Sequence, residues 1–341
     1  YKKFIFNASN DSTLFRSYPS NILMRQVFVV VVGHNDKQWL LRCFNALSES
    51  QYSAVRIIYV DNSSSDGSED LVADSFSHIE IISLCSNDGY AGGNNRGIER
   101  AVSLGADYIL LLNPDTRLSS DCISKLVSYA ENNHDIGIIG PVQYCYRDSL
   151  SEELVYNEWT EDAISSSSRH VFYHWHDDLA DDVVCNTGDD GFLETTYVQG
   201  SAMFFKTDIV RECGLLHESF KTYYEDVEYC RRLRLLGYRN GILTTAKVEH
   251  AGNAGRTSYS EYTMYYFNRN KYLYLLSDKE LNFRVMTTIF IRWIVYDCRC
   301  ALLAANVVET HPPIRKPVTL LKIFAALMFR GPVYFFLRIK R

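Results

Sequence analysis

The sequence predicts an α/β protein, a mostly parallel sheet flanked by helices, and three observations support this fold class. Strand-like and helix-like segments alternate through the first half of the chain. Residues 27–32 form an apolar, mainly β-branched run, which is typical of a strand buried on both faces. Polar or glycine-rich segments follow the predicted strands, at the ends where such sheets bind ligands.

The individual elements follow from apolar periodicity and turn residues. The first helix starts after Asp36 and has Leu40, Phe44 and Leu47 on one face. The turn-rich segment 61–67 reads as a loop. Strands are expected at 27–32, 55–60, 79–84, 108–112, 136–139, 197–205 and 238–249, and further helices up to about 104, at 120–132 and from about 225.

Composition limits the classes of protein that the chain can belong to. Its 341 residues, 47% hydrophobic and 22% charged, fit a folded globular protein with one large core or two smaller ones. A net charge of -6 argues against a nucleic-acid partner. The nine scattered cysteines favour reduced thiols, and no apolar run has the layout of a signal peptide or the length of a spanning helix. We expect a cytoplasmic protein.

Charge is distributed unevenly along the chain. Residues 148–194 are strongly acidic and read as an irregular insertion, whereas residues 283–341 are basic with apolar stretches. The basic region is predicted to be helical. It fits either ordinary core helices with solvated basic faces or an amphipathic surface on anionic lipids, at the cytoplasmic face of the inner membrane.

Two loops after predicted strands offer ligand contacts. Asp61 ends a buried strand, where it could accept hydrogen bonds from a base or ribose, or equally could cap the serine-rich turn. The run 87–97 is rich in glycine and precedes a helix, so backbone N–H groups could bind an anion there; a turn without a ligand is the alternative. The residues of this run that we assign to a ligand are Asn87, Gly89, Gly92, Gly93 and Asn94.

The segment Asn113-Pro114-Asp115 follows an apolar strand directly. Pro114 cannot extend a strand ladder, so Asp115 is expected to point out of the sheet edge. An exposed carboxylate there suits Mg²⁺ or Mn²⁺ bridging two phosphates, although a structural turn would use the same residues.

Acidic and basic groups in the second half complete the candidate site. Glu225 and Asp226 open a helix, where they either cap it or, in the case of Asp226, act as a general base. His250 follows an apolar strand and is either a core histidine or a metal or phosphate ligand. Arg256 could bind a diphosphate.

Taken together, these residues resemble the nucleotide-diphospho-sugar transferases of glycosyltransferase family 2. The likeness is greatest to the bacterial rhamnosyltransferase and galactofuranosyltransferase branch, which builds cell-surface polysaccharides such as O-antigen. It runs from about residue 27 to 256. The matching motifs are residues 29–35, 60–64, 87–97, 111–115, 200–203 and 224–228, with Arg231 and Arg232.

The resemblance implies a GT-A fold, a dTDP- or UDP-linked donor and a saccharide or lipid-linked acceptor. It also implies an inverting, metal-dependent transfer of rhamnose, galactofuranose or a hexose. Asp226 would be the base, Asp115 and His250 the Mg²⁺ or Mn²⁺ ligands, and Gly200 and Glu225 would lie on the acceptor side. His34, Asn35, Asp61 and Arg256 would contact the donor, together with Asn113 in place of a first acid.

The implied organisation has four parts. Residues 1–26 form an extension, 27–140 bind the nucleotide-sugar, 141–282 bind the acceptor and carry the acidic insertion, and 283–341 form the basic C-terminal helices.

A sugar nucleotidyltransferase would be expected to carry a glycine-rich basic loop after the first strand, where this chain has Gly33-His34-Asn35. A non-catalytic sugar-binding module on the same scaffold is the alternative from another class.

Overall fold

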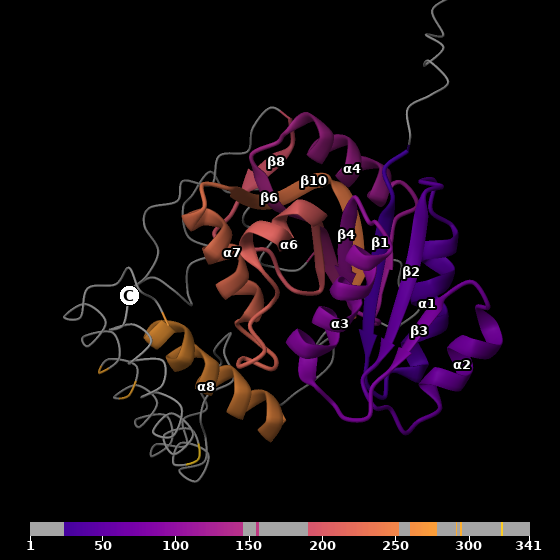
Figure 1. The fold of residues 1–341 in the computed structure, drawn as a ribbon, viewed down its shortest axis with the longest axis horizontal. Helices are drawn as coiled ribbons and strands as arrows, with labels where there is room; N and C mark the ends of the chain where they lie inside the picture. The colour runs from indigo at the N-terminus through magenta and orange to yellow at the C-terminus, as the bar shows by residue number, and fades with distance from the viewer. Residues whose placement is uncertain are drawn as a thin grey trace, which may run out of the picture.

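A computed structural model describes residues 24–145, 155–156, 190–251 and 260–277, with the isolated residues 291, 294 and 322. These residues form one ten-stranded sheet with helices on both faces (Figure 1). The strands are β1 (Val27–Gly33), β2 (Val55–Asp61), β3 (Glu80–Ser83), β4 (Tyr108–Leu112), β5 (Thr116–Leu118), β6 (Ile136–Cys145), β7 (Val155–Tyr156), β8 (Phe192–Glu194), β9 (Ala202–Lys206) and β10 (Arg239–His250). The helices are α1 (Lys37–Ser48), α2 (Ser68–Ser75), α3 (Gly89–Ser103), α4 (Cys122–Asn132), α6 (Thr207–Cys213), α7 (Glu225–Leu235) and α8 (Glu261–Ser277).

The sheet is parallel in its first half and mixed as a whole. Its order is β3-β2-β1-β4-β9-β6-β10-β5, with β7 beside β6 and β8 beside β10. Strands β3, β2, β1 and β4 pair in parallel, whereas β9 runs antiparallel to β4 and to β6. The predicted α/β fold is confirmed, and β9 is the strand that joins its two parallel parts.

Strand β1 shows why the first half folds as it does. Val27, Val29 and Val31 pack into a core shared with α1, α2 and α4. Phe28 and Val30 pack on the opposite face into a core shared with α3, α6 and α7. A strand covered by helices on both sides must be apolar at every position, which is what its sequence indicates.

The glycine-rich run lies within α3 rather than before it. A Cβ atom on Gly93 would lie 2.5 Å from Val32 Cγ1, and one on Gly97 would lie 2.1 Å from Val30 Cγ1. These glycines therefore let α3 pack closely on β1. Asn94 is 1% exposed and its side chain donates to the Tyr90 carbonyl one turn earlier, so it too has a packing role.

Several elements differ from the sequence-based expectation. Residues 197–201 precede β9 instead of belonging to a strand, and the elements α2, α6, α8 and β5 were not predicted. Most of the acidic insertion, Arg256 and most of residues 283–341 lie outside the described residues. Within the described part of the chain, no helix is long and apolar enough to cross a membrane.

Candidate active site

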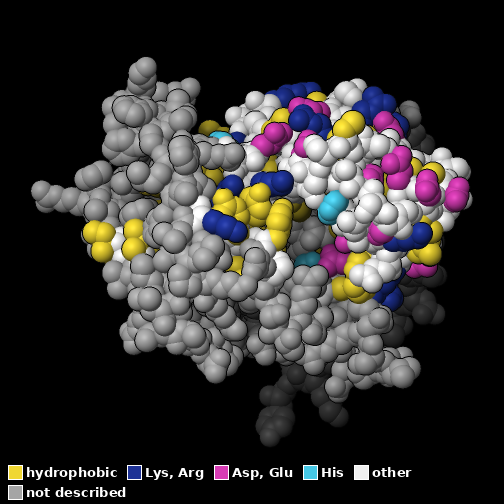
Figure 2. All heavy atoms as spheres, turned by 90° about the horizontal axis from the view of Figure 1, so that it is seen from below, with side chains coloured by type: hydrophobic (Ala, Val, Ile, Leu, Met, Phe, Trp, Pro, Cys, Tyr) yellow, Lys and Arg dark blue, Asp and Glu magenta, His cyan; other side chains and the backbone are white. Residues whose placement is uncertain are grey.

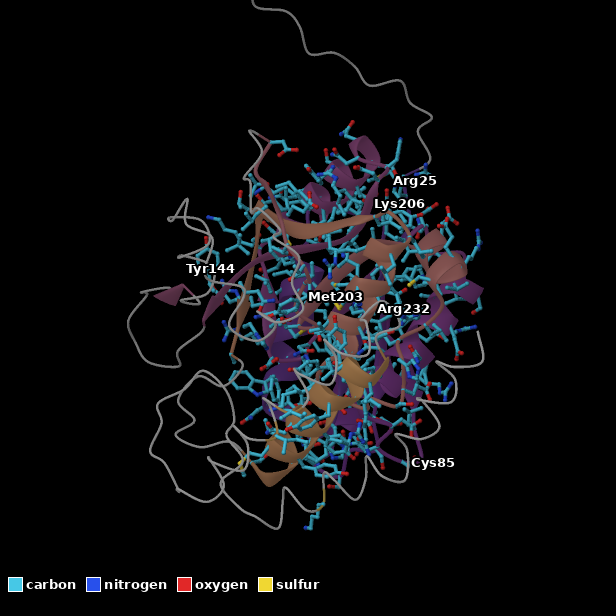
Figure 3. The ribbon with its side chains drawn as sticks, turned by 90° about the vertical axis from the view of Figure 1, so that its left-hand side faces the viewer. Arg25, Cys85, Tyr144, Met203, Lys206 and Arg232 are labelled. Atoms are coloured by element: carbon cyan, nitrogen blue, oxygen red, sulfur yellow. The ribbon has the colours of Figure 1, made fainter. Side chains whose placement is uncertain are left out.

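The first part of the site lies where the strand order reverses. From β1 the chain continues to β2 and β3 on one side of the sheet and then to β4 on the other. Ligands of open α/β sheets bind at the carboxyl ends of the strands beside such a reversal. In Figure 3, Arg25, just before β1, and Cys85, just after β3, lie at opposite ends of the molecule with Met203 between them. The crevice is at the end that Cys85 marks.

The loop after β1 is fastened to the loop after β2. His34 Nδ1 lies 2.9 Å from the Asn62 carbonyl oxygen. Asn35 has a left-handed φ of 59°, donates its N–H to Ser64 Oγ and accepts the N–H of Ser65 at Oδ1. His34 and Asn35 are exposed, and their hydrogen bonds fix the shape of this end of the sheet. Their contact with a donor stays a prediction.

Asp61 is only 3% exposed and is engaged by its own surroundings. The Tyr59 hydroxyl donates to its Oδ1 at 3.1 Å, and the Ser64 N–H donates to its Oδ2 at 2.8 Å. Asp61 thus caps the serine-rich turn, which is one of the two roles that the sequence allows. A contact of Asp61 with the base or ribose stays a prediction.

The loop after β2 also holds the start of α3, through a residue that the sequence did not single out. Asn62 accepts the N–H of Asp88 at 2.8 Å and donates to the Gly89 carbonyl at 3.0 Å. Asn87 accepts the N–H of Gly89 at 2.8 Å. Both amide side chains thus anchor the first turn of α3. The predicted anion contact of this turn is not available at Gly89 or Ala91, because their N–H groups donate to Asn87 and to the Lys221 carbonyl.

Asp115 and His250 come together although they are far apart in the sequence. Asp115 Oδ1 lies 3.3 Å from His250 Nε2, and each side chain is about one-fifth exposed. Strand β5 pairs antiparallel with β10, which places Thr116 opposite His250, and Ala251 donates its N–H to the Asp115 carbonyl. The neighbouring Asn113 donates its own N–H to the Ser201 carbonyl.

Asp36 is a further acid at this place. It precedes α1 as expected, but its carboxylate makes no cap bond and instead accepts the N–H of His34 at 2.8 Å. Burial raises the pKa of Asp36, and the negative charge of Asp115 raises it further. From the sequence, Asp36 is predicted only to precede a helix, because its closeness to Asp115 depends on the neighbouring positions of β1 and β4 in the sheet.

A divalent cation fits Asp115 and His250 in part. A carboxylate oxygen and an imidazole nitrogen are both ligands that Mn²⁺ takes, and the carboxylate suits Mg²⁺. Within the described ranges, no three His, Cys, Asp or Glu side chains converge to hold a metal. The two residues are therefore a partial ligand set, of the kind that phosphate oxygens of a bound substrate complete.

The second part of the site is a cavity of about 440 Å³ that contains Asp226 and His250 together. Asp226 Oδ2 accepts the N–H of Gly200 at 2.9 Å, and its Oδ1 accepts the N–H of Val227 at 2.9 Å. The Gly200 carbonyl in turn accepts a hydrogen bond from the Tyr90 hydroxyl. The cavity is lined by Tyr90, Asn113, Tyr197, Gln199, Gly200, Ser201, Thr222, Tyr223, Tyr224, Glu225, Asp226, Val227, His250 and Phe267.

The two adjacent acids of this cavity differ in their surroundings. Burial raises the pKa of Asp226, although the N–H groups of Gly200 and Val227 favour its charged form. Burial raises the pKa of Glu225 well above its usual range, and the charge of Asp226 adds to the effect. Among the described residues Glu225 Oε2 has no hydrogen-bond partner. Asp226 is therefore the acid of the pair that ionises first.

The backbone before Glu225 is strained. Lys221, Tyr223 and Tyr224 have left-handed φ values of 65°, 66° and 73° without being glycine. Such residues cost of order 1–3 kcal/mol each, and they persist where the surroundings hold them. Strain of this kind is typical of functional loops.

An open α/β sheet with acids at its strand reversal and an acidic cavity beside it has the crevice that α/β enzymes use to bind their ligands. Comparison with known proteins narrows this class. The profile described as glycosyl transferase family 2 matches residues 28–187, and that of glycosyl transferase family group 2 matches residues 108–329, more than half of the chain. The chain belongs to glycosyltransferase family 2, and it is an enzyme that uses a nucleotide sugar.

Two curated relatives are 25% identical to the chain. The low-salt glycan biosynthesis hexosyltransferase Agl10 of Haloferax volcanii matches over 253 residues, 74% of this chain and 76% of the relative. The dTDP-rhamnosyl transferase RfbF of Shigella flexneri matches over 226 residues, 66% of this chain and 69% of the relative.

Solved structures confirm the GT-A fold. TarS of S. aureus, residues 1–349 in complex with UDP, has a TM-score of 0.53 at 12% identity and covers 83% of this chain and 76% of its own. The mannosyltransferase PcManGT of Pyrobaculum calidifontis, in complex with GDP-Man and Mn²⁺, has a TM-score of 0.54 at 14% identity and covers 93% of this chain and 85% of its own.

Proposed function

We propose that the chain is an inverting, metal-dependent glycosyltransferase that builds bacterial cell-surface polysaccharide. It moves rhamnose, galactofuranose or a hexose from a dTDP- or UDP-linked donor to a saccharide or lipid-linked acceptor. The observation that carries the proposal is that Asp226, the candidate base, shares one cavity with His250 and Asn113 from the diphosphate side. A single displacement with inversion requires a base that reaches the acceptor hydroxyl on the side of the anomeric carbon opposite the departing diphosphate.

The donor is proposed to lie in the crevice at the ends of β1, β2 and β4. His34, Asn35 and Asn113 follow the strands at this end of the sheet, beside the start of α3. The Gly89 and Ala91 N–H groups of that first turn donate to Asn87 and to the Lys221 carbonyl, so the proposed diphosphate contacts rest on the strand-end loops. A dTDP- or UDP-linked donor is supported by two similar proteins, the dTDP-rhamnosyl transferase RfbF and TarS in complex with UDP.

Asp115 and His250 would hold Mg²⁺ or Mn²⁺ together with the donor diphosphate. When bound, the ion supplies Lewis-acid stabilisation of the leaving diphosphate. Support for the ion comes from the 3.3 Å approach of the two side chains and from the Mn²⁺ in the complex of PcManGT.

The acceptor hydroxyl is proposed to give its proton to Asp226. The Gly200 and Val227 N–H groups bind both oxygens of this carboxylate, which favours its charged form and fixes its orientation. Glu225, on the same cavity wall, would contact the acceptor through its unpartnered oxygen. Aromatic side chains such as Tyr197 and Phe267 line the cavity and offer apolar faces to a sugar ring. Figure 2 shows hydrophobic and basic side chains gathered near acidic and histidine side chains on one face of the molecule.

A nucleotide-sugar panel tests the proposal. Thermal unfolding is measured with dTDP-rhamnose, UDP-galactofuranose, UDP-glucose, UDP-galactose and GDP-mannose, each with and without Mn²⁺. A bound donor at a hundred times its Kd adds about 2.7 kcal/mol of stability, and we expect this for a dTDP- or UDP-sugar only with the metal present. Stabilisation by none of them, or equal stabilisation without metal, would contradict the proposal.

A further inference from the structure

Three consecutive polar residues of α8 are buried, and the proposed reaction uses none of them. Asn268 is 4% exposed, Arg269 6% and Asn270 0%. Buried polar side chains are retained where they have hydrogen-bond partners, because an unpaired group would cost free energy. The partners of Asn268 differ from those of Arg269 and Asn270.

Asn270 binds the loop that leads to the acidic pair. Its Nδ2 lies 2.8 Å from the Phe220 carbonyl oxygen, 2.6 Å from that of Thr222 and 2.7 Å from that of Tyr223. An amide nitrogen carries only two protons, so these three carbonyls share them. One side chain thus holds three nearly consecutive peptide groups.

Arg269 binds the same loop and also orients Asn270. Its Nη2 donates to the Ser219 carbonyl at 2.6 Å and to the Phe220 carbonyl at 2.8 Å. Its Nε donates to Asn270 Oδ1 at 2.8 Å, which turns the NH₂ group of Asn270 toward the loop. The guanidinium lies 4.8 Å from the centre of the Tyr266 ring, which covers it.

The other side of this loop contacts α3. The Lys221 carbonyl accepts the N–H of Ala91 at 3.0 Å, and a Cβ atom on Gly89 would lie 2.4 Å from the Lys221 oxygen. The loop, residues 219–224, is thus held between α8 and the first turn of α3. Three of its residues have left-handed φ values, and Glu225 and Asp226 follow it directly.

We propose that Arg269 and Asn270 are positioning residues, which hold loop 219–224 in its strained conformation so that Glu225 and Asp226 face the cavity. The donors of α8 replace the regular hydrogen bonds that an irregular loop cannot make with itself. The expected effect of Arg269 and Asn270 on turnover rests on the proposed function of Asp226. Their expected effect on the loop rests on the hydrogen bonds alone.

The test compares Asn270→Ala and Asn270→Asp with Asn268→Ala in the full chain. Asn270→Asp keeps the side-chain volume and removes the donors. Asn268→Ala is the matched control, because the Asn268 Nδ2 group donates at 2.9 Å to the Met264 carbonyl of its own helix. Arg269→Lys, which keeps the charge and loses the planar guanidinium group, tests the other positioning residue.

Hydrogen exchange measured by mass spectrometry reports on the loop without reference to activity. We expect backbone amides of residues 217–227 to exchange at least about tenfold faster in both Asn270 variants than in the wild type, since the carbonyls lose their donors. Exchange in β1 and β4 should be unchanged, which shows that the variants are folded. Unchanged exchange of 217–227, or equally fast exchange in Asn268→Ala, would overturn the proposal.

Turnover is measured as release of the nucleotide from the nucleotide sugars named above, with Mn²⁺ present. We expect turnover to fall by about a hundredfold in the Asn270 variants with the donor KM unchanged, because a displaced base affects the step and not donor binding. Loss of donor affinity with normal turnover would overturn the positioning role. A wild-type chain that cleaves none of these donors counts against the proposed function. The hydrogen-exchange comparison still shows in that case whether Arg269 and Asn270 hold loop 219–224.

Discussion

At the scale of single residues, Glu225 and Asp226 show how neighbours can meet different surroundings. Asp226 accepts two backbone N–H groups, whereas Glu225 is 4% exposed and leaves one oxygen without a hydrogen-bond partner among the described residues. Two acids this close titrate as a pair, so their apparent pKa values belong to both. Sequence alone placed both acids at a helix start but could not tell which would keep its proton.

The raised pKa of Glu225 has a consequence for stability. Folding raises this pKa, so the folded chain binds the proton more tightly than the unfolded chain, and stability falls as pH rises above the unfolded value of about 4.3. The variant Glu225→Gln resembles the protonated acid. We expect its Tm to equal that of the wild type near pH 4 and to exceed it increasingly toward pH 8.

Thermal unfolding between pH 4 and pH 8 measures this difference. Glu49→Gln, a change of the same type at an exposed site, is the control and should show no such trend. A Tm gain that does not depend on pH, or a loss at pH 8, would show that Glu225 is not held in its neutral form.

At the scale of elements, α3 depends on glycine for its place against β1. Gly97→Ala adds a Cβ atom 2.1 Å from Val30 Cγ1, and Val30 is fully buried. Alanine favours a helix by about 1 kcal/mol over glycine, whereas overpacking a core costs about 1–3 kcal/mol. Because Val30 lies in a strand paired on both sides, we expect the packing cost to prevail and Gly97→Ala to be less stable.

Urea unfolding measures this loss. Glu99→Ala on the exposed face of α3 is the control, and it should change stability by less than about 0.5 kcal/mol. A Gly97→Ala chain more stable than the wild type would mean that α3 does not need the close approach to β1.

Elements that could be predicted are those whose signal is local. Strands β1 to β4 are apolar runs, and the start of α7 carries acids, so their positions follow from the sequence. The short β5 and the start of β9 depend on pairing with strands from other parts of the chain. The burial of the polar run Asn268–Asn270 within α8 depends on the contact of this helix with a distant loop, so it could not be predicted locally.

At the scale of the whole molecule, the site exists because distant segments meet. The antiparallel pairing of β5 with β10 brings His250 to Asp115, and the Gly200 N–H brings the segment before β9 to Asp226. The sequence named these four residues, and three-dimensional pairing alone places them together. Asp36, Asn62 and Tyr90 support the same region, and their roles become visible only through these contacts.

In the proposed mechanism, Asp115 and His250 serve metal-dependent donor binding, whereas Asp226 serves proton removal from the acceptor. The most direct test measures donor Kd and turnover with Mn²⁺ for Asp226→Asn and Asp115→Asn, with the exposed Asp208→Asn as a control. We expect Asp226→Asn to bind donor normally and lose at least about a hundredfold in turnover. Asp115→Asn should lose the metal-dependent part of donor binding. Near-normal turnover by Asp226→Asn would contradict the proposed role of Asp226 as the base.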